Sequence, residues 1–154
     1  MVRVWRLTKT RHAAQALSGE GARLYGGRWT GLGVRVVYTS GSLSLATLEI
    51  LVHLQSDRSL PSYSSITIDI PSGLIETVDE QQLPDHWREF PAPAELRIIG
   101  EDWLRTLRST VMKVPSAITP HEYNFLINPS HPGFRDLVIG DPAPYPLDRR
   151  FRPR

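Results

Sequence analysis

One acidic side chain stands out in the sequence because its surroundings are apolar. Glu49 lies in the stretch SLSLATLEILVHLQ, between Leu48 and Ile50 and within one helical turn of Leu45 and Val52. A carboxylate in such a setting either faces water at the edge of an amphipathic helix or lies in a pocket, where burial and neighbouring groups tune it. In a pocket it would serve as a general base or stabilise a developing positive charge.

A second candidate follows two glycines in LYGGRWTGLGVRVVYTS, residues 24–40. Glycine lets a backbone approach a ligand closely, and the planar guanidinium of arginine binds phosphate through two parallel hydrogen bonds. Arg28 directly follows Gly26 and Gly27, so we expect it to bind an anionic group. Tyr38 closes the apolar run and offers a ring face for stacking, whereas Trp29 is expected to lie in the core.

The segment VPSAITPHEYNFLINPSHPGF, residues 114–134, holds polar side chains among four prolines. Prolines stiffen a loop and so keep such side chains at fixed positions. The same residue types are also ordinary turn formers, so a ligand role and a turn role both stay open. The polar residues in question are Ser116, Asn124, Asn128 and His131.

Several established kinds of site are missing from the sequence. The chain has no cysteine, which excludes disulfides and thiolate metal sites. Its histidines form no HxH or HExxH pattern, so no metal site is expected. There is no GxSxG motif of an α/β-hydrolase, and GEGARLYGG does not match the GxxxxGK[ST] phosphate loop.

Length and composition describe an ordinary globular chain. The 154 residues fit a single domain, 1–154, large enough to bury a core. Hydrophobic residues make up 40% and charged residues 22%, and the net charge is only +2. The first residues lack an apolar signal core and no run reaches the length of a membrane span. We therefore expect a cytoplasmic protein without membrane contact.

The elements that must position these residues are mostly short strands. Hydrophobic patterning predicts strands at residues 2–7, 34–40, 65–70, 74–78, 110–116, 137–140 and 145–151. Helices are expected at residues 12–18, 42–55 and 101–107. Ser42 or Ser44 would cap the second helix, whose buried face would carry Leu45, Leu48 and Val52. Many short strands with few helices favour an α+β domain over a doubly wound parallel sheet.

Four motifs, in this order, together resemble a known family. GEGARLYGGRW, VVYTS, LATLEILVHL and VPSA followed by EYNFLINPSHPGF are similar to the RES domain family. Its members are toxins of bacterial toxin–antitoxin pairs, named for an arginine, a glutamate and a serine. The resemblance runs from about Trp5 to the final DRRF. The sequence departs from the family at Thr30, where asparagine is more usual.

The resemblance implies a compact α+β fold similar to the diphtheria-toxin-like ADP-ribosyltransferases, with short sheets and few helices. It also implies that NAD binds in a cleft and is consumed as a substrate, not held as a cofactor. The ADP-ribose would pass to water, phosphate or a protein. The family's functional positions map onto Arg6, Arg28, Tyr38, Glu49 and Ser116.

These positions suit the chemistry of NAD. Breaking the glycosidic bond develops oxocarbenium character at the ribose carbon, which the Glu49 carboxylate would stabilise. The catalytic candidates are therefore Glu49, Arg28 and Ser116, and all five mapped residues are candidates for binding NAD. Arg6 would hold the nicotinamide ribose or a phosphate. Ser116 would bind the ribose or orient Glu49.

The resemblance further implies an antitoxin of the Xre helix-turn-helix type, through which DNA would be contacted only indirectly. A homodimer stays open.

Two other functions remain as alternatives. The tail DRRFRPR has four arginines within residues 149–154 and would suit a non-enzymatic module that binds nucleic acid. His53 and His131 would suit a ribonuclease-type toxin that leaves NAD untouched.

Overall fold

The computed structural model describes residues 1–54 and 61–151. Its strands are β1 (Val2–Lys9), β2 (Val37–Ser40), β3 (Tyr63–Ile70), β4 (Ile75–Thr77), β5 (Val111–Pro115), β6 (Tyr123–Ile127), β7 (Val138–Ile139) and β8 (Ala143–Tyr145). Its α-helices are α1 (Glu20–Tyr25), α2 (Leu43–Leu51) and α3 (Ala94–Thr106). Short 3-10 helices cover Thr10–Gln15, Ser72–Leu74, Glu80–Gln82, Pro132–Asp136 and Arg149–Phe151.

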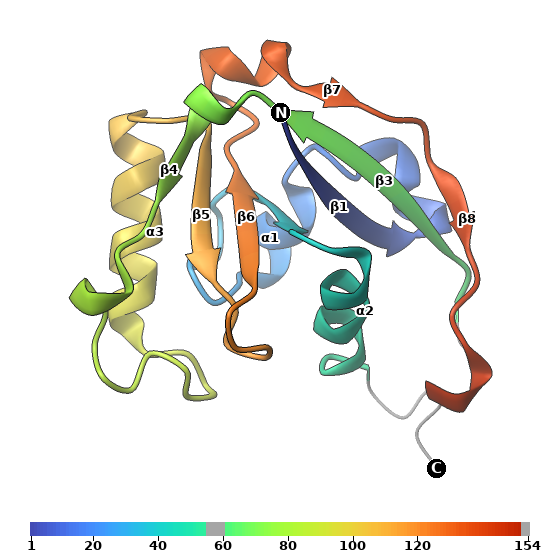
Figure 1. The fold of residues 1–154 in the computed structure, drawn as a ribbon, viewed down its shortest axis with the longest axis horizontal. Helices are drawn as coiled ribbons and strands as arrows, with labels where there is room; N and C mark the ends of the chain where they lie inside the picture. Colours follow the sequence, from blue (N-terminus) through green and yellow to red (C-terminus); the bar gives the residue numbers. More distant parts are fainter. Residues whose placement is uncertain (55–60, 152–154) are drawn as a thin grey trace.

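The strands form one mixed sheet in the order β4–β5–β6–β2–β1–β3–β7, with β8 also pairing to β3. Only β4 and β5 run parallel; the other pairs are antiparallel. Figure 1 shows the sheet arching over the molecule, with α3 flanking β4 and β5 and α2 below β1. The expected α+β class is confirmed.

The sheet is nearly divided where β1 meets β2. These two strands share a single residue pair, Trp5 with Ser40, whereas β1 pairs with β3 along all eight of its residues. The helix α1 and the turn before it lie across this gap and contribute the wall of a cavity. The division therefore opens the sheet at its centre, next to the residues that the sequence marks as functional.

Two strand predictions need correction. No strand was predicted at Tyr123–Ile127, yet β6 lies at the middle of the sheet between β5 and β2. Its side chains are buried from Phe125 onward, so it lacks the alternation of a half-buried strand. The final strand expected at 145–151 is also wrong: β8 ends at Tyr145 and a 3-10 turn follows. Proline cannot donate to a ladder, and Pro146 follows directly.

The helix predictions were partly wrong. The helix expected at 12–18 is a 3-10 turn, Thr10–Gln15, and α1 was not predicted at all. The helix expected at 101–107 starts earlier, at Ala94, because Pro93 precedes it and supplies its first backbone acceptor.

The helix predicted at 42–55 is α2, with Ser42 as its N-cap, and it ends at Leu51. Residue 55 lies outside the described residues. The predicted buried face is wrong at two positions, since Leu48 and Val52 are 38% and 58% exposed. The helix instead buries Leu45 and the two residues that follow it against the sheet.

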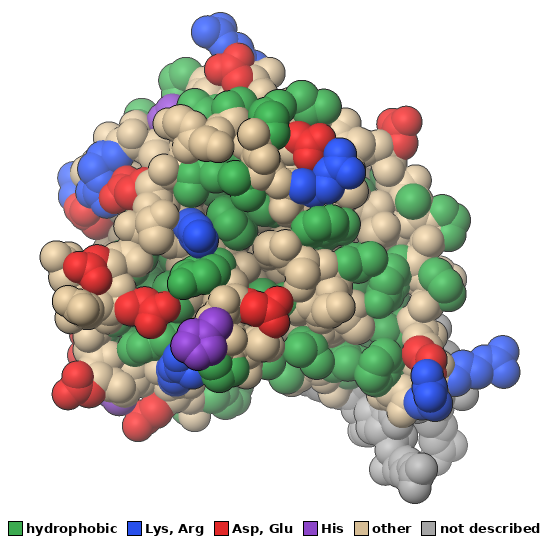
Figure 2. All heavy atoms as spheres, viewed as in Figure 1, with side chains coloured by type: hydrophobic (Ala, Val, Ile, Leu, Met, Phe, Trp, Pro, Cys, Tyr) green, Lys and Arg blue, Asp and Glu red, His purple; other side chains and the backbone are tan. Residues whose placement is uncertain are grey.

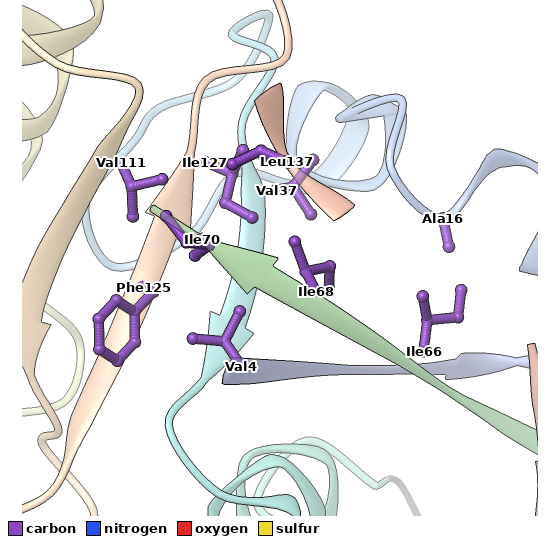
Figure 3. Close-up of a cluster of buried hydrophobic side chains, with 10 residues drawn as sticks. All are labelled: Val4, Ala16, Val37, Ile66, Ile68, Ile70, Val111, Phe125, Ile127 and Leu137. Atoms are coloured by element: carbon purple, nitrogen blue, oxygen red, sulfur yellow. The ribbon is translucent and has the colours of Figure 1, made fainter. Parts of the chain in front are cut away.

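Separate hydrophobic clusters fill the molecule. The first lies under the arch of the sheet (Figure 3) and contains Val4, Ala16, Val37, Ile66, Ile68, Ile70, Val111, Phe125, Ile127 and Leu137. The second joins α3 to the sheet and includes Trp29, Trp87 and Trp103, so Trp29 is a core residue as expected. Here α3 packs so closely that a Cβ added at Gly100 would overlap the carbonyl oxygen of Trp29.

Candidate functional site

Arg6 lies on β1 at the edge of the gap between β1 and β2. Its Nη1 donates to the carbonyl oxygen of Tyr38 at 3.2 Å. Its Nε is buried and has no hydrogen-bond partner among the described residues. Burial lowers the pKa of the guanidinium from its ordinary value. A desolvated cation with an unused donor is stabilised by an incoming anion.

The cavity beside Arg6 has a volume of about 220 Å³. α1 and its flanking residues form one wall, including Gly21 and Gly26, and β2 forms another through Val37 and Tyr38. Tyr25 stands at its rim with 84% of its surface exposed. Bare glycine backbone beside an arginine is the setting that suits a phosphorylated ligand.

Tyr38 is held by the loop that carries Arg28. Its hydroxyl lies 2.8 Å from Thr30 Oγ1 and accepts a hydrogen bond from the Trp29 backbone nitrogen at 3.2 Å. Burial raises the pKa of this phenol. A Cβ at Gly27 would lie 2.6 Å from the ring carbon Cζ, so only glycine lets the loop approach the ring. Thr30, where the sequence departs from the family, therefore makes a defined contact.

Arg28 is half-buried and braces a neighbouring loop. Its Nη1 donates to the carbonyl oxygens of Trp87 and Glu89, at 2.9 and 3.0 Å. Partial burial lowers the pKa of the guanidinium, and the charges of Glu49 and Tyr38 oppose that shift. Both protons of Nη1 are thus used, which leaves the fork formed by Nε and Nη2 for a ligand.

Glu49 is half-buried on α2 and faces β6. Its Oε1 accepts a hydrogen bond from Asn124 Nδ2 at 2.8 Å. The side-chain oxygen of Asn124, Oδ1, in turn accepts from Ser40 Oγ at 2.8 Å. Ser40 and Asn124 are direct partners across β2 and β6, so their side chains share one face of the sheet. This chain of three residues fixes the carboxylate, and Oε2 stays available.

Ser116 is only 1% exposed and its hydroxyl is engaged by its own loop. The Oγ accepts from the backbone nitrogens of Ile118 and Thr119, at 3.1 and 3.0 Å. Its backbone nitrogen donates to the carbonyl oxygen of Glu122. Ser116 thereby closes the hairpin between β5 and β6.

His131 has a structural role. Its Nδ1 accepts from the Gly133 backbone nitrogen at 2.9 Å and lies 2.9 Å from Thr110 Oγ1, while Nε2 lies 3.1 Å from the Leu107 carbonyl oxygen. Both ring nitrogens are therefore occupied. Asn128 likewise serves a turn, because its Oδ1 accepts from the Ser130 backbone nitrogen.

Hydrogen bonds link two of the predicted residues and the loop of a third. Arg6 donates to the Tyr38 carbonyl oxygen, and the Tyr38 hydroxyl accepts from the backbone nitrogen of Trp29, next to Arg28. Glu49 is held separately by Asn124. Within residues 1–54 and 61–151 no three His, Asp or Glu side chains gather as metal ligands would. None of the helices in that part of the chain has the length and apolarity to cross a bilayer.

Sequence analysis assigned no specific role to Asn124. It did not identify the carbonyl groups of Trp87 and Glu89 as partners of Arg28 either. The polar asparagine in the apolar run YNFLI was the available signal. Recognising it required knowing that this run is a strand beside Ser40. Backbone carbonyls carry no residue-type signal, so no pattern would have identified the contact with Arg28.

The geometry defines what Arg6, Arg28 and Glu49 can do chemically. An oriented carboxylate with one free oxygen can accept hydrogen bonds from hydroxyls or face a developing cation. Arg6 and Arg28 are partly desolvated guanidinium groups, and each can bind an anionic group such as a phosphate. The arrangement therefore suits a phosphorylated ligand that develops positive charge near Glu49.

Similar proteins span most of the chain. It is 40% identical to the protein named Toxin Res from Photorhabdus laumondii over 136 residues, which cover 88% of this chain and 86% of that protein. It is 37% identical to Toxin Res from Yersinia enterocolitica over 151 residues, 98% and 97% of the two chains. The Prs ADP-ribosylating toxin from Sphingobium is 37% identical over 138 residues, 86% of each.

The fold also has a solved counterpart. A chain in the crystal structure of the M. tuberculosis MbcT–MbcA toxin–antitoxin complex superposes with a TM-score of 0.74. The match covers 93% of this chain and 83% of that one, with 18% identical residues, so it supports the fold alone. The RES domain model matches residues 3–148, nearly the whole chain, and with the relatives above it shows that the protein belongs to the RES domain family.

Proposed function

We propose that this chain is the toxin of a toxin–antitoxin pair and that it consumes NAD by breaking the bond between nicotinamide and ribose. Three relatives that align over most of the chain are named as toxins, one of them as an ADP-ribosylating toxin. ADP-ribosylation takes its ADP-ribose group from NAD. The likeness of sequence supports the same substrate here.

One observation carries the proposal: the carboxylate of Glu49 is held by a neutral donor and lies within the electrostatic influence of Arg28. The Glu49 carboxylate is half-buried, accepts one hydrogen bond through Oε1 and leaves Oε2 free. Such a group suits a reaction in which positive charge develops.

The remaining residues suit the other parts of NAD. Arg28 would bind the pyrophosphate through Nε and Nη2 while its Nη1 holds the loop at Trp87 and Glu89. Arg6 would give its unpartnered Nε to a phosphate or a ribose hydroxyl in the adjoining cavity. Tyr38 would pack its ring against the ligand. Ser116 would act by positioning the hairpin rather than by contact.

The reaction follows from these positions. As the bond between the ribose carbon and nicotinamide breaks, its electron pair passes to the ring nitrogen, and neutral nicotinamide leaves. The ribose carbon takes on oxocarbenium character, which the Glu49 carboxylate stabilises. An acceptor then bonds to that carbon: water gives ADP-ribose, phosphate gives a phosphorylated ADP-ribose, and a protein side chain gives an ADP-ribosylated protein.

The alternative functions have less support. A nucleic-acid binder needs unpaired positive charge, but several arginines are paired with acidic residues, namely Arg3, Arg23, Arg35, Arg105, Arg108 and Arg150. On the face shown in Figure 2, basic and acidic side chains are interspersed. Residues 152–154 of the basic tail lie outside the described residues. A ribonuclease using His131 would need a ring nitrogen that is already hydrogen-bonded.

The partner that we propose is an antitoxin of the Xre helix-turn-helix type, as the family resemblance implies. A toxin that drains NAD must be silenced in the cell that makes it. A segment of the antitoxin that covers Arg28, Tyr38 and Glu49 would achieve this directly. Contact with DNA would then pass through the antitoxin, and a homodimer of the toxin is compatible with the same scheme.

The function is tested by incubating the purified protein with NAD, with and without phosphate, and identifying the products by mass spectrometry. We expect free nicotinamide together with ADP-ribose, phosphorylated ADP-ribose or, after addition of cell extract, a modified protein. Glu49→Gln keeps the shape but loses the charge, and it should lower turnover by roughly 100-fold or more.

The matched control is Glu95→Gln, an exposed glutamate on α3, which should retain wild-type turnover. Thermal unfolding shows that each variant is folded. If the wild-type protein leaves NAD intact under every condition, or if Glu49→Gln turns over NAD as fast as the wild type, the proposed function is wrong.

A further inference from the structure

The function proposed above uses Asn124 only as the neutral donor to Glu49 and gives it no task of its own in the reaction. Asn124 lies on β6, opposite Ser40 of β2 on one side and Val114 of β5 on the other. A polar side chain at the middle of three strands is costly unless its hydrogen bonds are satisfied. Here both ends of the amide are used.

The neighbours of the amide fix its orientation. Ser40 Oγ donates to Asn124 Oδ1 at 2.8 Å, so the oxygen of the amide points to β2 and the nitrogen points to α2. The nitrogen then donates to Glu49 Oε1 at 2.8 Å. A carboxylate can only accept, so the reversed amide would face Glu49 with a second acceptor and is excluded.

The same end of the hairpin is joined to the start of α2 by two further contacts. Ser42 Oγ donates to Glu122 Oε1 at 3.1 Å, and the Gly41 backbone nitrogen donates to the Tyr123 carbonyl oxygen at 3.0 Å. These contacts hold the helix against β6 whether or not Asn124 is present. The bond to Glu49 is therefore not needed to dock the helix.

The chemistry of the donor indicates its purpose. An arginine or lysine in this place would pair with Glu49 and weaken the field that a cationic transition state needs. An amide donates one hydrogen bond, occupies Oε1 alone and leaves the negative charge in place. It also removes one rotational freedom of the carboxylate, so Oε2 points in one direction before any ligand arrives.

We propose that Asn124 is the positioning residue of the reaction: it orients the Glu49 carboxylate for the developing charge without neutralising it. The proposal rests on the proposed function, because it assigns Asn124 a task in the chemistry of Glu49. A misplacement of about 1 Å in a reacting group costs on the order of 100-fold in rate. Loss of Asn124 should therefore lower kcat and leave the binding of NAD nearly unchanged.

The test measures kcat and KM for nicotinamide release from NAD in Asn124→Ala and in Asn124→Leu, which nearly keeps the volume of the side chain. Both should lower kcat by about 100-fold and change KM by less than about threefold. The matched control is Glu122→Ala, which removes the contact with Ser42 at the same junction and should keep kcat within about threefold. Thermal unfolding is followed for each variant.

The outcomes separate this proposal from the function on which it rests. If Glu49→Gln is as active as the wild type, the proposed function fails first. If Glu49→Gln is inactive while both Asn124 variants keep kcat, Asn124 has no part in positioning. An equal fall in Glu122→Ala, a rise in KM in place of a fall in kcat, or failure of both Asn124 variants to fold would show a merely structural residue and overturn the proposal.

Discussion

At the scale of single residues, Arg28 can hold a neighbouring loop and still present free donors to a ligand, and a lysine could not do both. Its Nη1 holds the carbonyl oxygens of Trp87 and Glu89 while the other nitrogens stay available. An ammonium group is one compact donor centre, so it would satisfy either the loop or the ligand. The planar fork would allow the Arg28 side chain to hold the loop and, as proposed, to bind a phosphate as well.

We therefore expect Arg28→Lys to weaken NAD binding by about 1–3 kcal/mol, the range for hydrogen bonds to charged groups. Isothermal titration calorimetry on a catalytically silent background, such as Glu49→Gln, measures the change in Kd. Arg105→Lys, on the exposed side of α3, is the control and should bind as the parent does. An unchanged Kd in Arg28→Lys would remove Arg28 from the site.

A second prediction at the residue scale concerns Tyr38, because burial raises the pKa of its phenol above the ordinary value of 10.0. The folded protein holds the phenol proton to higher pH than the unfolded chain does. This contribution to stability is complete below about pH 10 and is lost as pH rises from there through the folded-state pKa. Tyr38→Phe should flatten the fall in unfolding free energy above pH 10.

Urea denaturation between pH 7 and pH 11 measures this slope. At neutral pH the variant should lose about 1 kcal/mol, because the hydroxyl no longer bonds to Thr30 and the Trp29 nitrogen. Tyr25→Phe, at a ring that is 84% exposed, is the control. A slope in Tyr38→Phe equal to that of the wild type would show that the Tyr38 phenol does not set the alkaline limit.

At the scale of elements, α3 determines where the Arg28 loop lies. Gly100 meets the carbonyl of Trp29, and Glu101, one residue on, accepts from the Gly31 backbone nitrogen at 3.2 Å. Gly100→Ala would force the helix and the loop apart, and overpacking of this kind costs about 1–3 kcal/mol. We expect the variant to unfold at lower urea and to bind NAD more weakly.

Gly73→Ala is the matched control, because a Cβ at Gly73 meets nothing within 4 Å. It should be neutral or slightly stabilising, since alanine lowers the entropy of the unfolded chain. Equal stability of Gly100→Ala and the wild type would mean that the loop can shift without cost and that α3 does not position Arg28.

The elements also show how far the sequence alone could reach. Alternation identified β1 and β3, and the Ser42 cap identified the start of α2, because these signals are local. Sequence patterning did not predict β6, because a strand buried at the centre of a sheet lacks alternation and because prolines flank this segment. Patterning did not predict α1 either, because the helix has only six residues and Gly21 among them disfavours a helix.

The site divides in the same way. Residue type and motif pointed to Arg28, Tyr38 and Glu49, and their part in a site stays a prediction. The turn role of Ser116 and the contact between Asn124 and Glu49 could not be found, since both depend on pairings between distant segments. Sequence patterns report local neighbours, whereas a site is built from tertiary ones.

At the scale of the whole molecule, the proposed antitoxin should cover the opening of the site. Exposed apolar side chains stand near the cavity, since Tyr25 is on its rim and Leu24 precedes it on α1, with 84% and 54% of their surfaces exposed. Hydrogen–deuterium exchange of the toxin with and without its antitoxin measures which amides become protected. We expect protection in α1, in the loop around Arg28 and in the last turn of α2, which carries Glu49.

Protection confined to the outer strands β7 and β8 would place the partner on the far edge of the sheet instead. Inhibition would then need an indirect mechanism. A useful control is the exchange of α3, which flanks β4 and β5 on the side away from α2 (Figure 1) and should change little if the partner covers only the opening.

The pairing of β2 with β6 also sets the moment at which the protein becomes dangerous during its own synthesis. Glu49 and Asn124 are 75 residues apart in the chain. A ribosome adding about 5–20 residues per second needs roughly 4–15 s to make that interval. Throughout this time Glu49 exists without the strand that orients it. On the proposed function, a nascent chain would be inactive until translation is nearly complete, and an inhibitor made alongside it would have that interval in which to accumulate.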